Sequence, residues 1–172
     1  MFYPRRHLAW PTVNPRSGNP GEAAVLNAFV QRRLGVLLPF GEGHPYDLVV
    51  AVATAFLRVQ CKTAWANQGC IVFNAYATDH GRGQVSYAGR ADAFGVYFPP
   101  RETVYVVPVG VSRSEMRLRM DPARNNQRRR VRLAVEYEIE SWTPGALFDL
   151  ASRAGTQAHE PAGPVRSVHA RA

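Results

Sequence analysis

We predict a single mixed α/β domain, in which a mixed sheet of five or six strands packs against a helix, from three features of the sequence. Short apolar segments rich in Val, Phe and Tyr are separated by turn residues, as is typical of strands. One segment, residues 20–34, carries its apolar residues at helical spacing. A chain of 172 residues with 46% hydrophobic composition can build one core, but not two domains of ordinary size.

The predicted domain occupies residues 19–141. Residues 1–18 are rich in Pro, Arg and aromatic residues without any period, and we expect an extended arm there. The helix begins after Asn19, a good N-cap, with Pro20 in its first position and Glu22 completing a capping-box pattern. We expect it to run to about Leu34, where Gly35 ends it.

Strands are predicted at residues 36–38, 46–53, 56–63, 70–76, 93–98 and 103–109. The second and third of these form an antiparallel hairpin that turns near residues 53–55. The polar, Gly-rich segment 77–90 is interpreted as a loop, whereas residues 131–139 fit a helix or a strand equally well. In the terminal segment, residues 142–172, we predict a short helix at 143–152 followed by a disordered tail.

Three residues of the predicted hairpin, Asp47, Gln60 and Lys62, form a polar cluster. Because strand side chains alternate, Gln60 and Lys62 lie on one face and Cys61 on the other. An antiparallel hairpin returns this polar end to Asp47, so that a carboxylate, an amide oxygen and an ammonium converge at one end of an apolar sheet. Burying such groups is costly, and a bound cation and catalysis would justify it.

Lys62 is the only lysine among the 21 basic residues. A compact ammonium that can lose a proton serves general acid–base chemistry, whereas a guanidinium does not. The alternative is chance, with a strand lysine that extends to solvent. For Glu22, spacing on the helix leaves two interpretations open: it only caps the helix, or it faces the sheet as a further carboxylate of the Asp47 site.

The net charge of +8 and the pI near 10.2 indicate a polyanionic partner, and favour nucleic acid over a membrane. No apolar run is long enough for a transmembrane helix, and two cysteines form no disulfide framework, so we expect a cytoplasmic protein with reduced thiols. The segment 113–132 contains eight arginines, interrupted by Asp121-Pro122 and by the amides of residues 125–127, and such a cluster can bind both phosphates and base edges. A solvated basic loop is the alternative. The DNA-binding residues that we predict are Tyr87, Arg113, Arg124, Asn125, Asn126, Gln127, Arg128, Arg129, Arg130 and Arg132.

The order of Glu22 in the first helix, then Asp47, then Gln60-x-Lys62 resembles the PD-(D/E)XK nuclease superfamily. Within it, the chain is most similar to the group I intron-associated endonucleases, whose third motif is commonly Gln-x-Lys. The segments that carry this resemblance, in order, are GEAAVLNAF, LPFGEGHPYDLVV, RVQCKTAW, YAGRADAFGVYF, VYVVPV and DPARNNQRR. Two departures stand out: Tyr46 precedes Asp47 where the motif has Pro, and the turn at residues 53–55 lacks glycine.

This resemblance implies a metal-dependent, sequence-specific DNA endonuclease of the homing type, with its nuclease domain in residues 19–141. It implies four catalytic residues, Glu22, Asp47, Gln60 and Lys62. The implied metal ligands are Glu22, Asp47, Gln60 and the main-chain carbonyl of Cys61, binding Mg²⁺ with Mn²⁺ as a substitute. The partner is double-stranded DNA, and one site per chain implies a homodimer or homotetramer. The alternatives are a structure-specific, repair or restriction nuclease on the same fold, and a non-catalytic nucleic-acid-binding protein.

Overall fold

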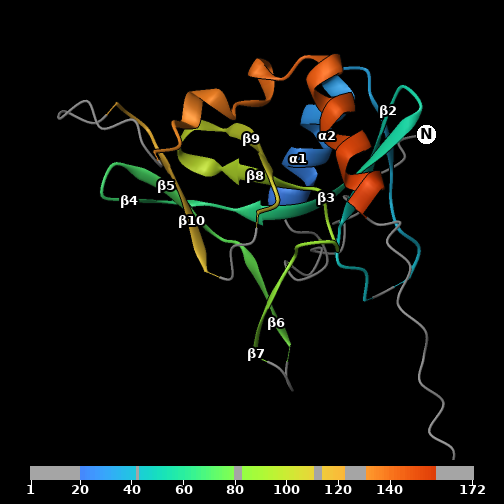
Figure 1. Ribbon diagram of the computed structural model, residues 1–172. Coiled ribbons are helices and arrows are strands. Elements are labelled where there is room, and N and C mark those ends of the chain that lie inside the picture. Colours follow the sequence, from blue (N-terminus) through green and yellow to red (C-terminus); the bar gives the residue numbers. More distant parts are fainter. Residues whose placement is uncertain (1–19, 42, 80–82, 111–113, 123–130, 158–172) are drawn as a thin grey trace, which may run out of the picture.

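The computed structural model describes residues 20–41, 43–79, 83–110, 114–122 and 131–157 (Figure 1). Within these residues, a five-stranded mixed sheet of order β1-β2-β3-β8-β9 is covered on one face by two helices, α1 (Pro20–Gln31) and α2 (Pro144–Gln157). The mixed α/β architecture predicted from the sequence is confirmed. No helix in the described part of the chain is long and apolar enough to span a membrane.

The strands of this sheet are β1 (Gly35–Leu37), β2 (Leu48–Val52), β3 (Ala55–Thr63), β8 (Ala93–Phe98) and β9 (Thr103–Pro108). Neighbouring strands are antiparallel except β3 and β8, which are parallel with Gln60 opposite Phe94. Alternate residues of β2 and β3 face the helices and are fully buried. They form a core with Val25 and Phe29 of α1 and Leu147 of α2.

The β2–β3 hairpin is antiparallel and turns where the sequence predicted. Val52 pairs with Ala55, so the turn contains two residues only. Ala53 adopts φ +52, a left-handed conformation in which glycine or asparagine is usual, and the hairpin therefore forms in spite of its turn sequence. At the other end of the hairpin, the main-chain N–H of Asp47 donates to the Val59 carbonyl at 2.9 Å.

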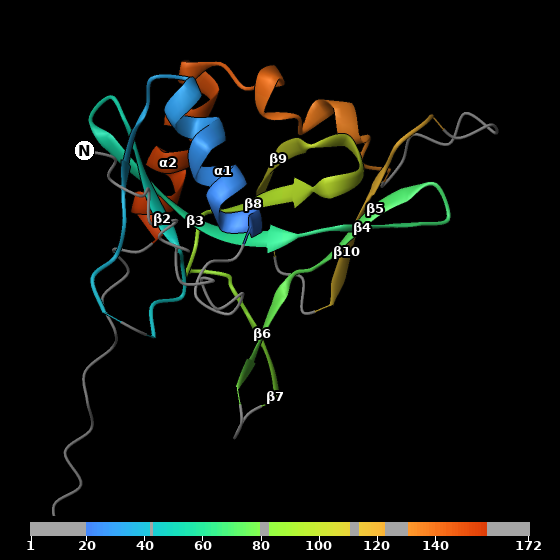
Figure 2. The same ribbon diagram turned by 180° about the vertical axis from the view of Figure 1, so that it is seen from behind.

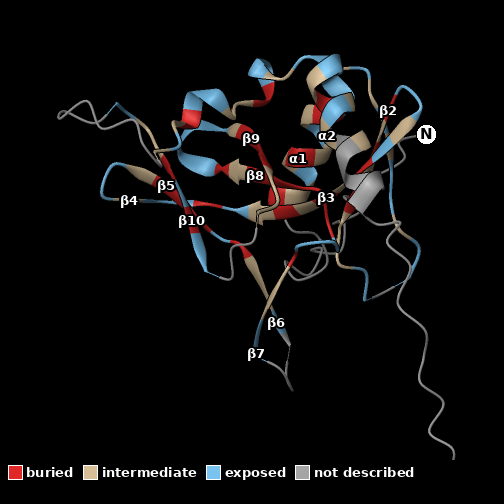
Figure 3. Ribbon diagram, viewed as in Figure 1, coloured by how far each residue is buried: buried red, intermediate tan, exposed pale blue. Residues whose placement is uncertain are grey.

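The opposite face of β8 and β9 packs on a second sheet, of order β10-β5-β4. Its strands are β4 (Trp65–Asn67), β5 (Cys70–Asn74) and β10 (Glu115–Arg119). Ile71, Phe73 and Leu118 from this sheet join Phe94 and Tyr105 in a second apolar core. Figure 3 shows the buried residues concentrated on the strands and the inner faces of the helices.

A separate hairpin, formed by β6 (Tyr76–Asp79) and β7 (Gly83–Ser86), projects from the body of the molecule (Figures 1 and 2). The sequence prediction of a loop at residues 77–90 was therefore wrong. The hairpin strands are short, partly exposed and mostly polar, so they lack the apolar alternation that identifies a half-buried strand.

Several element boundaries also differ from the prediction. Helix α1 ends at Gln31, and not at the predicted Leu34, because Arg33 takes the left-handed position at φ +59. The N–H groups of Arg33 and Leu34 then bond the Val30 and Phe29 carbonyls, as in a Schellman motif. The predicted strand 70–76 stops at Asn74, and the N–H of Ala75 bonds the Ser114 carbonyl before β6 begins.

The C-terminal part of the described chain is less regular than predicted. Residues 131–139 form neither a long helix nor a long strand, but a 3₁₀ turn at Ala134–Glu136 with isolated bridges to β9 and β10. A second 3₁₀ turn, Ile139–Ser141, precedes α2. Helix α2 is longer than the predicted 143–152 and packs on β2 and β3.

The close approach of α1 to the sheet yields a test of this packing. A Cβ atom on Gly95 of β8 would overlap Val25 of α1 and lie 3.0 Å from the Val59 side chain. We expect Gly95→Ala to lower the free energy of unfolding by about 1–3 kcal/mol, as overpacking does, measured by urea denaturation. Gly35→Ala is the matched control, because its Cβ would meet Ala51 at an ordinary 3.5 Å. Equal stability of the two variants would contradict the tight contact.

Candidate active site

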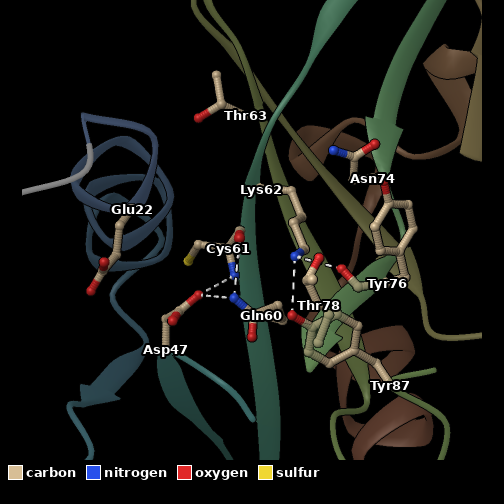
Figure 4. A pocket seen from close by; sticks show the side chains of 11 residues that line it. Glu22, Asp47, Gln60, Cys61, Lys62, Thr63, Asn74, Tyr76, Thr78 and Tyr87 are labelled. Atoms are coloured by element: carbon tan, nitrogen blue, oxygen red, sulfur yellow. Dashed lines mark hydrogen bonds between the residues drawn. The ribbon is translucent and has the colours of Figure 1, made fainter. Parts of the chain in front are cut away.

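A polar pocket opens beside the C-terminal half of β3, between α1 and the base of the β6–β7 hairpin (Figure 4). Four elements contribute to it, so the pocket exists only when the sheet, the helix and the hairpin are assembled. The residues that line it are Glu22, Asp47, Gln60, Cys61, Lys62, Thr63, Asn74, Tyr76, Ala77, Thr78 and Tyr87.

Asp47 is held at the open end of the β2–β3 hairpin by hydrogen bonds from the neighbouring strand. Its Oδ2 accepts the Cys61 main-chain N–H at 2.7 Å and a bond from the Gln60 side-chain amide. These bonds and the charge of Lys62 favour the carboxylate, but burial outweighs them and raises the pKa of Asp47 above its ordinary value of 3.8.

The side chain of Gln60 presents its nitrogen, and not its oxygen, to the carboxylate (Figure 4). The same Nε2 also lies 3.3 Å from the Cys61 main-chain oxygen. The amino group thus stands between the Asp47 carboxylate and the Cys61 carbonyl, which are two of the predicted metal ligands. For Oε1 of Gln60 to face the same point, the amide must rotate.

Lys62 lies on the same side of β3 as Gln60, as the alternation predicts, and Cys61 is buried on the helix side. The Lys62 Nζ donates to the Tyr87 hydroxyl at 3.1 Å and to the Tyr76 main-chain carbonyl at 3.5 Å. Lys62 is therefore directed into the pocket and does not extend freely into solvent.

Glu22, in the first turn of α1, also lines this pocket, and Figure 4 shows its carboxylate to the left of Asp47 and directed away from Lys62. Partial burial, and then the negative charge of Asp47, raise the pKa of Glu22. The second of the two interpretations of Glu22, a carboxylate of the Asp47 site, stays a prediction. Burial and the same two carboxylates also raise the pKa of the Cys61 thiol, so that this sulfur is a poor ligand or nucleophile.

The oxygen groups at this pocket suit a hard divalent cation. Within the described residues, no group of three or more His, Cys, Asp or Glu side chains could hold a metal. Two carboxylates, an amide oxygen and a main-chain carbonyl nevertheless belong to the ligand types of Mg²⁺ and Mn²⁺. A cation would also relieve the cost of burying the ionised Asp47. The donor set therefore fits the predicted metal.

Most of the predicted DNA-binding residues lie outside the part of the chain that the structure describes. Arg132 is exposed, and its carbonyl accepts the Arg119 N–H at 2.8 Å. Tyr87 is only 6% exposed and lies in the pocket, and its predicted DNA contact stays a prediction. The others lie outside the described residues: Arg113, Arg124, Asn125, Asn126, Gln127, Arg128, Arg129 and Arg130.

Sequence reasoning missed one buried ion pair next to the site. The Asp92 carboxylate, which is 2% exposed, accepts the Arg58 guanidinium at 2.6 Å and its main-chain N–H at 2.7 Å. Arg58 is two residues before Gln60 and lies on the same face of β3. The spacing of Arg58 from Gln60 could have placed Arg58 on the face of β3 that carries the site. Its partner Asp92 could not be found in this way, because Asp92 is brought close by the parallel pairing of β3 with β8, which local sequence patterns do not reveal.

The chain belongs to the PD-(D/E)XK endonuclease family, which matches residues 14–140. Among solved structures, it is similar to the bacterial homing endonuclease I-Ssp6803I, with 27% identity and a TM-score of 0.58. That match covers 81% of this chain and 97% of the other. No curated protein matches the chain. The predicted resemblance to this superfamily and to homing endonucleases is confirmed, and the protein is a nuclease of this family.

The raised pKa of Asp47 yields a test that needs no metal. The ionised carboxylate costs stability above its unfolded-state pKa, so Asp47→Asn should raise the melting temperature near about pH 8 in EDTA. The gain should shrink as the pH falls and vanish near about pH 2, where the carboxyl is protonated in both states. Calorimetry across this range measures it. The control is Asp149→Asn, an exposed carboxylate on α2. A gain that does not depend on pH, or that the control shares, would contradict the assignment.

Proposed function

We propose that the protein is a metal-dependent endonuclease of the homing type, associated with a group I intron, which cuts double-stranded DNA at a specific sequence. The observation that carries this proposal is the meeting of Glu22, Asp47 and Gln60 with Lys62 in one polar pocket of a PD-(D/E)XK chain. The likeness to a bacterial homing endonuclease supports the type of nuclease. The complete set of costly polar groups disfavours a non-catalytic binding protein.

We infer that Asp47, the Cys61 carbonyl and, after rotation of its amide, Gln60 bind Mg²⁺, for which Mn²⁺ substitutes. Glu22 contacts the ion directly or through water. When bound, the ion activates a water and polarises the scissile phosphate. Gln60 supplies an oxygen but no charge, where a glutamate would supply both. We therefore expect weak metal affinity that depends on the DNA phosphate to complete the coordination shell.

Lys62 is the group that we assign to the attacking water. Its ammonium carries three protons, and the Tyr87 hydroxyl and the Tyr76 carbonyl accept two of them. The third is left for a ligand in the pocket. From this position, Lys62 can orient the attacking water, take part in its deprotonation, and stabilise the charge that develops on the phosphate.

We further propose that the chain acts as a homodimer or homotetramer in the cytoplasm. Each chain carries one candidate site, and cutting both strands of a duplex takes two, so a symmetric assembly on a partly palindromic target is the economical solution. Both cysteines are free thiols, which suits a reducing compartment. The predicted arginine-rich segment, residues 113–132, supplies phosphate contacts.

The assignment of Lys62 is tested by Lys62→Arg. A guanidinium keeps the charge, but it is larger and holds its proton too tightly for acid–base chemistry. We expect this variant to bind DNA like the wild type and to cut it at least ~100-fold more slowly. Asp47→Ala should likewise bind and fail to cut. A mobility-shift assay and a cleavage time course with Mg²⁺ on the same DNA measure both. Cleavage by Lys62→Arg at the wild-type rate would refute the catalytic role.

The role of the arginine-rich segment is tested through the salt dependence of binding. If the segment neutralises about six phosphates, DNA affinity should fall roughly a thousand-fold between about 50 and 200 mM salt. The triple variant Arg128→Ala, Arg129→Ala, Arg130→Ala should bind DNA more weakly, with a shallower salt slope. Its Mg²⁺ affinity, measured by calorimetry, should stay unchanged. DNA affinity equal to that of the wild type would favour the alternative interpretation, in which the segment is only a solvated basic loop.

A further inference from the structure

The partners of the Lys62 ammonium come from the residues on either side of the projecting β6–β7 hairpin. Tyr76, whose carbonyl accepts at 3.5 Å, is the first residue of β6, and Tyr87, whose hydroxyl accepts at 3.1 Å, follows β7 directly. The Lys62 Nζ also lies 4.7 Å from the centroid of the Tyr87 ring. The phenol therefore offers both a hydrogen-bond acceptor and an aromatic face to the same cation.

Tyr87 is itself held rigidly. Its ring is buried and meets Phe94 edge to face, with centroids 5.5 Å apart and an interplanar angle of 89°. Its carbonyl accepts the N–H groups of Arg90 and Ala91 at 2.9 and 3.0 Å, so that the chain turns tightly after it. Because the Tyr87 side chain is fixed in this way, it can hold the Lys62 ammonium in one position.

The Arg58–Asp92 ion pair anchors the turn that carries Tyr87. Asp92 binds both the side chain and the main-chain N–H of Arg58, and a guanidinium nitrogen of Arg58 donates to the Gly89 carbonyl at 3.3 Å. Residues 87–92 are thus attached to the same face of β3 that carries Lys62. The position of Tyr87 relative to Lys62 is therefore determined by β3, which carries Lys62, and by the Arg58–Asp92 ion pair, which holds residues 87–92 on that strand.

We infer that Tyr87 is a positioning residue that holds the Lys62 ammonium against the scissile phosphate, with the Arg58–Asp92 pair as its anchor. This inference rests on the proposed function of Lys62. A lysine on a flexible stem samples many rotamers, and only some of them direct the ammonium into the pocket. The hydroxyl of Tyr87 selects one of these, and the effect of losing it should therefore appear in the cleavage step and not in DNA binding.

The single lysine allows this inference to be tested without any activity. Protein labelled with ¹³C-lysine gives NMR signals from Lys62 alone. In the wild type, the two Hε protons should differ in chemical shift, because the side chain is fixed beside an aromatic ring. In Tyr87→Phe, which keeps the ring but removes the acceptor, they should move toward a common value. The control Tyr105→Phe alters a buried tyrosine that does not line the pocket, and should leave both signals unchanged. Averaged Hε signals in the wild type, or unchanged ones in Tyr87→Phe, would overturn the inference.

Kinetics separate this inference from the proposed function. Tyr87→Phe should lower the single-turnover cleavage rate about 10-fold, the scale of one hydrogen bond to a charged group. Kd for DNA should stay unchanged, because the hydroxyl binds Lys62; a weaker Kd would support the DNA contact predicted from the sequence instead. A structural defect would instead lower stability and binding together. If Lys62→Arg cuts slowly and Tyr87→Phe cuts at the wild-type rate, the inference fails alone. If Lys62→Arg also cuts at the wild-type rate, the proposed function has failed, and the NMR result still decides whether Tyr87 holds the lysine.

Discussion

The hydrogen bond from the Cys61 main-chain N–H to the Asp47 carboxylate, 2.7 Å long, is the contact on which the site depends. It joins the open ends of β2 and β3, so the register of this apolar hairpin determines where the Asp47 carboxylate lies. Gln60 and Lys62 are then placed by alternation along β3. Glu22 reaches the same pocket because Gly95 lets α1 lie close on the sheet. A shift of one residue in the hairpin would remove every one of these contacts.

The buried carboxylates of the site lower the stability of the folded protein. Burial raises the pKa of both Asp47 and Glu22, so the ionised forms that the proposed metal needs are less favourable than in water when no cation is present. The amino group of Gln60 offsets part of this cost, because it lies between the carboxylate and the Cys61 carbonyl where a positive charge is favourable. A glutamate at this position could not do so. Gln60 thus suits a protein that must remain folded before the proposed metal and the DNA bind.

The local pattern predicted the α1 helix, the central strands and the placement of Asp47, Gln60 and Lys62 in one pocket, because alternation and helical period act within a few residues. It failed where the chain breaks local rules or relies on distant contacts. Arg33, and not a glycine, ends α1, and Ala53 forms a tight turn without glycine. The residues of the β6–β7 hairpin are too polar for its strands to be recognised from an alternation of apolar residues. The contact between Tyr87 and Lys62 depends on the pairing of β3 with β8, which brings together residues 25 positions apart.

The most direct test of the account is anomalous diffraction from crystals of the protein grown with Mn²⁺ and DNA. The account predicts a peak within about 2.0–2.3 Å of an Asp47 carboxylate oxygen and of the Cys61 carbonyl. The Gln60 amide should be rotated so that its oxygen faces the ion, with the Lys62 ammonium directed at the scissile phosphate. A fully occupied Mn²⁺ site elsewhere on the protein, with the Gln60 amino group still bonded to Asp47, would contradict it.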